Sequence, residues 1–307
     1  MKVQDLIPIR IPGSGAGKDV YDEFEEDRHR DRKYSIPSTA EQLRDVYLAQ
    51  MKLFMKGYVP YTLLVLVIAI PIIIYSGVLD SLVIDSIREE IGDTGETYVA
   101  ICLGLISPMM ALIASIVCGS MLPAEFKHRT AYINFPIPQS RSIFYLGKFL
   151  AGYTLILATM LLVVAESVLM AVGAGYSSVS TTAVGQALLM AIAGSFALGA
   201  IAYGLSAFMT SGSTMLPFAI LFIIVPTLCL VLFNAFGCMS LLGYVPTSAG
   251  DLALASLGSN KTLGASTLMS DITLDMSASV PIAAAVCFGT GILFLFIGLF
   301  KTNSREI

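Results

Sequence analysis

The stretch from Ile143 to Val172, IFYLGKFLAGYTLILATMLLVVAESVLMAV, decides the fold class of this chain. Of its thirty residues, only Lys148 and Glu166 carry a formal charge. A helix needs about 20 predominantly apolar residues to cross the roughly 30 Å hydrocarbon core of a bilayer. The stretch therefore predicts a transmembrane helix that is long enough to tilt or to begin in the membrane interface.

Five further apolar stretches raise the expected number of membrane-spanning helices to six. The six predicted spans are residues 58–79, 99–122, 143–172, 183–209, 215–237 and 280–300. The composition agrees, with 56% hydrophobic and 13% charged residues, against about 45–50% and about 25% in an ordinary soluble domain. The 209 residues from Val99 onward hold 13 charges, too few to cover a soluble fold of that size. We therefore expect an all-α integral membrane protein.

Basic residues gather on one side of the predicted spans. Sixteen of the 18 lysines and arginines lie before the first span, between the second and third, or after the sixth, with Lys148 counted beside the loop that precedes it. Only Arg88 and Lys261 lie in the alternate segments. Because such residues favour the cytoplasmic side, we expect both termini in the cytoplasm and a multi-pass location in the plasma membrane.

Two predicted outer segments are long enough to fold. Residues 80–98 are acidic, and residues 238–279 are rich in Ser, Gly, Leu and Thr, which predicts short helices lying against the membrane. Asn260 begins the tripeptide Asn-Lys-Thr, a glycosylation sequon on the predicted outer face. Such tripeptides are common by chance, so Asn260 is a candidate modification site only.

The chain begins with a polar region in two parts. Residues 1–37 are rich in Gly, Pro and charge, and predict a partly disordered cytoplasmic tail, with a regulatory or partner-binding arm as the alternative. Ser38 and Glu41 form a capping-box pattern, and apolar residues then recur at helical spacing. Residues 38–57 therefore predict an amphipathic helix in the cytoplasmic interface. The alternative is a soluble helix packed on a cytoplasmic partner.

Several chemistries find no support in the sequence. The net charge of −4 gives no basic surface for nucleic acid. The run Gly13–Lys18 looks like a phosphate-binding loop, but Pro12 and Asp19 occupy the places of its first Gly and its Ser or Thr. The five cysteines lack metal-ligand spacing. We therefore expect neither an enzyme nor a cofactor or metal on this chain, and any ATP chemistry must come from another chain.

The segment between the second and third predicted spans contains more specific phrases. Glu125 follows the second span, the phrase FPIPQSRS occupies residues 135–142, and LGKFL opens the third span at residues 146–150. Together with QMKLF at residues 50–54 and the six-span layout, this segment resembles the type-2 family of ATP-binding-cassette transporter permeases. The resemblance extends to layout over residues 38–307 and to motifs over residues 119–150.

The resemblance implies a fold and a mechanism. Residues 58–307 would form the permease domain of a homodimer or pseudo-dimer that docks on two separate ATPase subunits, which carry ATP and Mg. Residues 38–57 would be the connecting helix, and Pro123–Thr130 the coupling helix. The residues that would contact the ATPase are Glu125, Phe126, Lys127, His128 and Arg129. Alternatively, the basic residues only fix topology and hold anionic lipid. The spans favour a lipid-like, amphipathic or drug-like exported substrate.

Two questions stay open at this point. Glu166 is the ionisable residue well inside the span pattern, and a polar packing role is favoured over a role in a transport pathway. The function has two rivals. One is a non-transporting membrane scaffold or assembly subunit for a cytosolic partner. The other is an ion-coupled secondary transporter, which would normally place ionisable groups near the membrane midplane.

Overall fold

The computed structural model describes residues 38–57, 110–127, 140–173, 180–209, 215–248, 262–266, 271–275 and 279–304, and scattered positions between 60 and 102. The predicted tail 1–37, nearly all of the outer segment 80–98, and Asn260 lie outside the described residues. In the predicted first span, the scattered positions that are described are helical.

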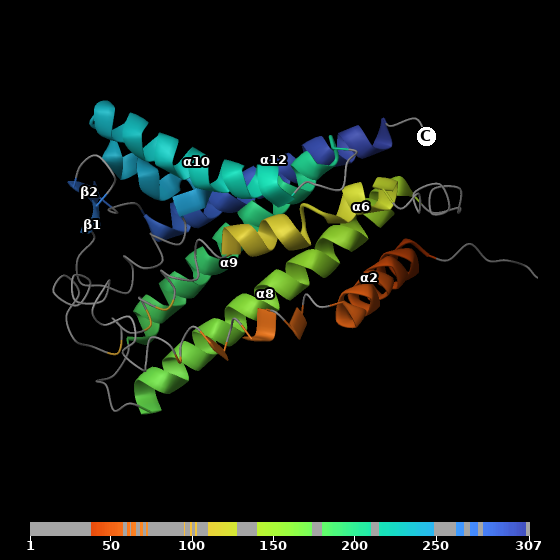
Figure 1. The fold of residues 1–307 in the computed structure, drawn as a ribbon, viewed down its shortest axis with the longest axis horizontal. Helices are drawn as coiled ribbons and strands as arrows, with labels where there is room; N and C mark the ends of the chain where they lie inside the picture. The colour runs from red at the N-terminus through yellow and green to blue at the C-terminus, as the bar shows by residue number, and fades with distance from the viewer. Residues whose placement is uncertain are drawn as a thin grey trace, which may run out of the picture. The chain divides into compact units, whose positions relative to one another are not determined.

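The described elements are helices apart from one small hairpin (Figure 1). The long ones are α2 (Thr39–Lys56), α8 (Arg141–Gly173), α9 (Thr181–Ser206), α10 (Met215–Ala235) and α12 (Val280–Asn303), and the short helix α6 (Met121–Lys127) precedes α8. Among the described residues, three helices are long and apolar enough to cross a membrane, namely α8, α9 and α12. They coincide with the third, fourth and sixth predicted spans, and α10 lies at the fifth.

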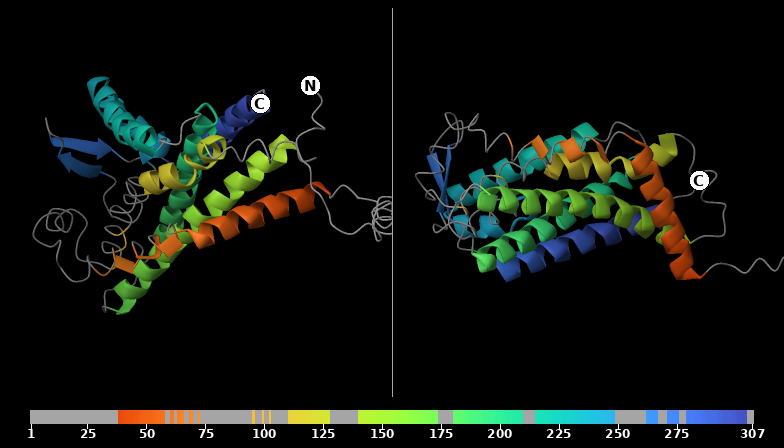
Figure 2. Two further views of the ribbon diagram at one scale, coloured as in Figure 1. Left: turned by 45° about the vertical axis from the view of Figure 1, so that its right-hand side comes forward. Right: turned by 90° about the horizontal axis from the view of Figure 1, so that it is seen from below.

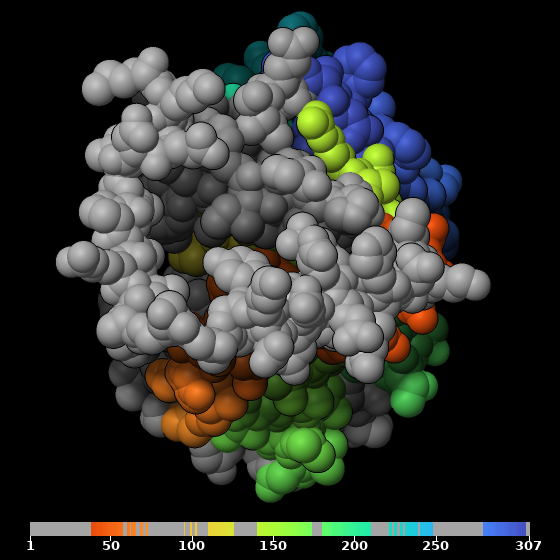
Figure 3. Space-filling model, turned by 90° about the vertical axis from the view of Figure 1, so that its right-hand side faces the viewer, coloured from red at the N-terminus to blue at the C-terminus, as the bar shows by residue number. Residues whose placement is uncertain are grey.

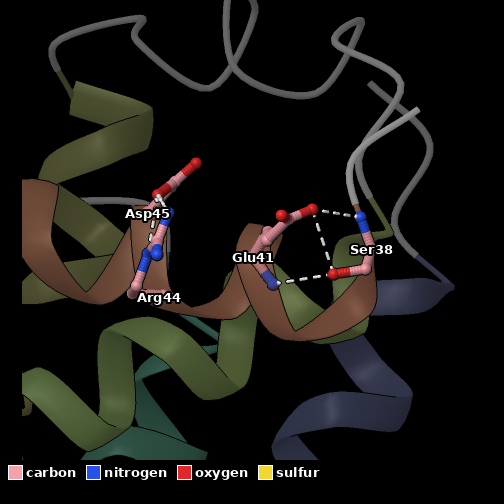
Figure 4. A network of polar contacts seen from close by, with 4 residues as sticks. All are labelled: Ser38, Glu41, Arg44 and Asp45. Atoms are coloured by element: carbon pink, nitrogen blue, oxygen red, sulfur yellow. Dashed lines mark hydrogen bonds and ion pairs between the residues drawn. The ribbon is translucent and has the colours of Figure 1, made fainter. Parts of the chain in front are cut away.

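Helix α2 begins where the capping box predicts. The Ser38 backbone N–H donates to the Glu41 carboxylate at 2.8 Å, and the Glu41 backbone N–H donates to the Ser38 hydroxyl oxygen at 3.4 Å (Figure 4). These bonds satisfy N–H groups that a helix start otherwise leaves unpaired. The helix ends at Gly57, whose backbone is extended. The sequence prediction for residues 38–57 is thus confirmed as a helix.

The predicted second span ends differently from expectation. Its described part is helical from Met110, but a turn at residues 118–120 interrupts it before α6 begins at Met121. The Gly119 N–H bonds to the Ala114 carbonyl oxygen at 3.3 Å, five residues back, so the helix unwinds there. The turn therefore lies within the last residues of the predicted span 99–122, and α6 begins after it as a short helix.

Helices α9 and α12 run parallel and in close contact along the α9–α12 seam, which we define by Gly204, Gly291 and Gly298. A Cβ added at Gly204 would collide with the Phe294 carbonyl oxygen, and one at Gly291 would lie 2.6 Å from the Phe196 ring. A Cβ at Gly298 would meet the Gly204 backbone and the Tyr145 hydroxyl. Small residues let membrane helices approach closely, and these three glycines do so here.

Aromatic rings join α8 to α9 and α12. The Phe149 ring lies 5.8 Å from the Phe196 ring, and the Phe196 ring lies 5.4 Å from that of Phe288, between ring centroids. Near the other end of this contact, the Tyr145 and Tyr203 rings are 4.6 Å apart. Residues early in α8 therefore face residues late in α9, so these two helices are antiparallel.

The predicted outer segment, residues 238–279, follows the sequence prediction only in part. The short 3₁₀ helices η3 (Met239–Tyr244) and η4 (Pro246–Ser248) agree with it. However, β1 (Thr262–Ser266) and β2 (Asp271–Asp275) pair as an antiparallel hairpin, with Thr262 opposite Asp275. The expectation of short helices is therefore wrong for β1 and β2, since DITLD in β2 alternates polar and apolar residues, the period of a strand, while the other described elements are helical. The hairpin lies at the end of the helices opposite to the C-terminus (Figures 1 and 2).

Candidate functional site

Helices α2, α6 and α9 come together at the start of α8. Gly147, Lys148 and Phe149 are consecutive, and a helix turns by about 100° per residue. They therefore face three different neighbours: α2, α6 and α9. We call this group of contacts, made by Gly147, Lys148 and Phe149 with Val46, Glu125 and Tyr203, the α8 hub.

Gly147 is where α2 crosses α8 (Figure 2). A Cβ added at Gly147 would lie 2.9 Å from Val46 Cγ1 and 3.4 Å from the Leu43 carbonyl oxygen. Val46 is β-branched and has little freedom to turn away. The glycine of the LGKFL phrase therefore allows α2 to lie directly against the backbone of α8.

Lys148 forms an ion pair with Glu125 of α6. The two side chains are 6% and 17% exposed, so both charges are largely removed from water. The Lys148 ammonium also lies 4.6 Å from the centroid of the Phe144 ring, a cation–π contact. Because a buried charge is costly unless it is paired, each partner depends on the other. The pair links α6 to α8 across 23 residues of sequence.

Phe149 connects the same turn of α8 to α9. Its ring centroid lies 5.5 Å from that of Tyr203. The Tyr203 hydroxyl donates a hydrogen bond of 2.8 Å to the Tyr145 carbonyl oxygen, which lies one turn earlier in α8. Both tyrosines are fully buried. The contact thus combines the packing of aromatic rings with a directional hydrogen bond. Together they fix the position of α9 along the axis of α8.

The first turn of α8 is also tied to the end of α12. The Arg141 guanidinium donates to the Asn303 carbonyl oxygen, and the Asn303 side-chain amide donates to the Ser142 hydroxyl, both at 3.3 Å. The start of α8 lies between α2 and the last part of α12 (Figure 3). Helices α8 and α12 are therefore antiparallel, and the hub lies at the end where the described chain finishes.

A cavity of about 340 Å³ opens beside the ion pair. Its walls are one face of α2 from Asp45 to Leu53, Phe144 and Lys148 of α8, and Glu125 of α6. The contact between α2 and the hub is therefore close at Gly147 and open beside Lys148. This combination leaves room for α2 and α6 to shift against α8.

The predicted ATPase-contacting residues have different outcomes. Helix α6 covers much of the predicted coupling helix but begins earlier, at Met121, and ends at Lys127. Glu125 lies in α6 and binds Lys148 of its own chain. For Phe126 and Lys127 the structure describes the helical backbone, while His128 and Arg129 lie outside the described residues. Contact of this segment with an ATPase stays a prediction.

Glu166 lies far from the hub on α8. Eighteen residues separate it from Lys148, which is about 27 Å along a continuous helix. Its side chain is partly exposed. Among the described residues, no hydrogen bond or ion pair engages Glu166. In the described part of the chain, Glu166 therefore has no polar partner that would support either a packing role or a role in a transport pathway.

The pairing of Lys148 with Glu125 escaped the sequence analysis, which assigned Glu125 outward and Lys148 to topology. A signal was present: charges at the membrane ends of spans tend to pair with one another, and these two flank one loop. The role of Gly147 was equally hidden, because a glycine in an apolar helix does not reveal which helix approaches it.

Known proteins give no further assignment. No protein-family model matches the chain, and none of the curated proteins compared with it matches. Within the described ranges, no cluster of His, Cys, Asp or Glu could hold a metal ion.

Proposed function

We propose that this chain is the permease subunit of an ATP-binding-cassette exporter, with six spans and both termini in the cytoplasm. Two such subunits, identical or related, would work with separate ATPase subunits that bind ATP and Mg. The α6 segment would dock on the ATPase, and α2 would act as the connecting helix. The cargo would be lipid-like, amphipathic or drug-like.

The observation that carries this proposal is the α8 hub. A cytoplasmic docking segment can drive transport only if its movement reaches the spans. Glu125 of α6 binds Lys148, so a displacement of α6 acts directly on α8. Phe149 and Tyr203 then connect α8 to α9, which packs against α12 along the α9–α12 seam. This route supports coupling between a cytoplasmic site and the spans.

The directions of the described helices also support the proposed topology. Helices α8 and α9 are antiparallel, and α9 and α12 are parallel, as the third, fourth and sixth spans of an alternating six-span chain would be. The polar hub lies at the end of the bundle that the distribution of lysines and arginines predicts to be cytoplasmic.

The test is purification of the full-length, tagged chain from its native membranes in mild detergent. We expect a cassette ATPase to copurify and ATP hydrolysis to appear in the eluate. Phe126→Ala should lower this associated activity at least fivefold, because a buried aromatic anchor carries much of an interface. Phe236→Ala is the matched control, since Phe236 is 75% exposed and lies at the opposite end, after α10.

A chain that purifies alone and transports without ATP hydrolysis would overturn the proposal and favour an ion-coupled transporter. A chain that binds a cytosolic protein with no ATPase activity would favour the scaffold. Substrate-stimulated ATP hydrolysis in the reconstituted complex would separate an exporter from an idle assembly.

A further inference from the structure

The cavity beside Lys148 has no assigned occupant in the proposed transport cycle. It lies between α2 and α8, and its volume of about 340 Å³ is at the lower end of the range for small-molecule sites. Apolar wall is supplied by Val46, Ala49, Leu53 and Phe144. Such a space admits a polar headgroup with its glycerol, but not a whole phospholipid.

The surface of α2 places this cavity at the level of lipid headgroups. Leu53 and Met55 are 65% and 55% exposed, and the exposed Lys52 and Lys56 flank them. A helix that exposes apolar side chains among lysines lies in the membrane interface, with the lysine ammonium groups reaching toward water. The cavity beneath α2 therefore faces the boundary between headgroups and acyl chains.

The charges around the cavity select the headgroup. Inside it, the Lys148 ammonium is already held by Glu125 and by the Phe144 ring. At its edge, Asp45 lies beside Arg44, with Nη2 and Oδ1 3.4 Å apart and the two side chains 64% and 66% exposed (Figure 4). A carboxylate and a guanidinium side by side complement a headgroup that carries both signs.

We propose that this cavity binds the headgroup and glycerol of phosphatidylethanolamine. The primary ammonium of this lipid has three N–H donors for the Asp45 carboxylate and the side-chain carbonyl of Gln50, whereas the trimethylammonium of phosphatidylcholine has none. Its phosphate accepts from Arg44, which can bind phosphate through two N–H groups. Anionic phosphatidylglycerol lacks the ammonium. Arg44, which lies beside the cavity, and the lining residues Asp45, Glu125 and Lys148 together carry no net charge, which matches a zwitterionic headgroup better than an anionic one.

The bound phosphatidylethanolamine would be a structural lipid between α2 and the rest of the helices. This inference depends on the membrane location of the chain and not on transport, so it can hold even if the transport proposal fails.

Native mass spectrometry of the delipidated full-length chain tests this inference, with phosphatidylethanolamine, phosphatidylcholine and phosphatidylglycerol of identical acyl chains added separately. We expect one phosphatidylethanolamine to be retained at least tenfold more strongly than either other lipid. Asp45→Asn should weaken its retention about tenfold, the loss typical of one charge-assisted hydrogen bond. Ala49→Phe should abolish retention by filling the cavity. Ala40→Phe, in the exposed first turn of α2, should not change it.

Equal retention of phosphatidylcholine would overturn the inference, as would preferential retention of phosphatidylglycerol. So would full retention by Asp45→Asn or Ala49→Phe, or loss in Ala40→Phe. Absence of any retained lipid would also overturn it and would leave the cavity to a protein partner. If Ala49→Phe fails to fold, the result for Asp45→Asn decides whether the inference holds. The Asp45 side chain is exposed and asparagine has nearly the same shape, so this variant should fold.

Discussion

The α8 hub and the α9–α12 seam hold neighbouring helices together by opposite means. The hub joins α2, α6 and α8 through a buried ion pair and a single glycine crossing, with a cavity beside them. The seam brings α9 and α12 into contact at Gly204, Gly291 and Gly298, where even a methyl group finds no space.

This difference indicates which parts move relative to each other. Closely packed interfaces have no spare volume and respond to force as one body. The seam should therefore keep α9 and α12 together in every state of the protein. The hub has room beside its ion pair, and a polar contact can break and form again. We expect relative movement of α2 and α6 against α8, and the following experiments examine this contrast.

The largest effect is expected from Glu125→Gln. It leaves the Lys148 ammonium, 6% exposed, without its counter-charge, and removing one partner of a buried pair costs about 3–5 kcal/mol. The measurement is the free energy of unfolding in detergent, followed by a thiol-reactive dye at the buried Cys118 and Cys287. The double variant Glu125→Gln with Lys148→Met removes both charges and should recover most of the loss. A single variant as stable as wild type would mean that the hub does not depend on the pair.

Gly204→Ala should rank second, at about 1–3 kcal/mol, because its methyl group would collide with the Phe294 backbone and overpack the seam. The same unfolding assay measures it. Gly185→Ala is the control in the same helix, since no atom lies within 4 Å of a Cβ placed there. It should be neutral or slightly stabilising. Equal stability of the two variants would contradict the close packing of the seam.

Gly147→Ala should have a smaller and more local effect, of about 1–2 kcal/mol. The added methyl group would press on Val46 and lift α2, while the contact between α9 and α12 stays intact. Limited proteolysis after residue 56 should therefore accelerate, with little change in dye access to Cys287. Val46→Ala in the same chain should restore protection. Failure of this rescue would show that α2 is held by other contacts.

Ser38→Ala should cost about 1 kcal/mol of α2 stability, because it removes the hydroxyl that caps the Glu41 backbone N–H. Hydrogen exchange of the first-turn amides of α2 is the readout, and amides of α12 serve as an internal control. Unchanged exchange would show that α2 is fixed from its packed face alone.

The smallest expected effect is a loss of stability at the start of α2 when the pH is lowered. Hydrogen bonds from the Ser38 backbone N–H and then from its hydroxyl lower the pKa of Glu41 below its usual value of 4.5. The capping contribution is therefore complete above pH 4.5 and is lost as the pH falls through the lowered pKa. Exchange at the start of α2 should accelerate in this range. In Glu41→Gln, whose amide also caps but does not titrate, the acceleration should be absent.

Regular features were predictable from the sequence because they depend on near neighbours. The runs at residues 143–172, 183–209 and 280–300 became α8, α9 and α12, and the Ser38–Glu41 pattern became a capping box. The hairpin was missed because a five-residue alternation is a weak signal inside a segment rich in Ser and Gly. The break at residues 118–120 was missed because hydropathy does not register a turn within an apolar run.

The sequence by itself determined that helices form, which of them are apolar enough for a bilayer, and where α2 begins. These properties follow from side-chain hydrophobicity and from backbone hydrogen bonds within a few residues. Only the tertiary structure decided that Lys148 pairs with Glu125, that Gly147 admits α2, and that Gly204 meets Phe294. Each of these contacts joins residues distant in the chain, because the angle of one helix against another is set by packing and not by local sequence.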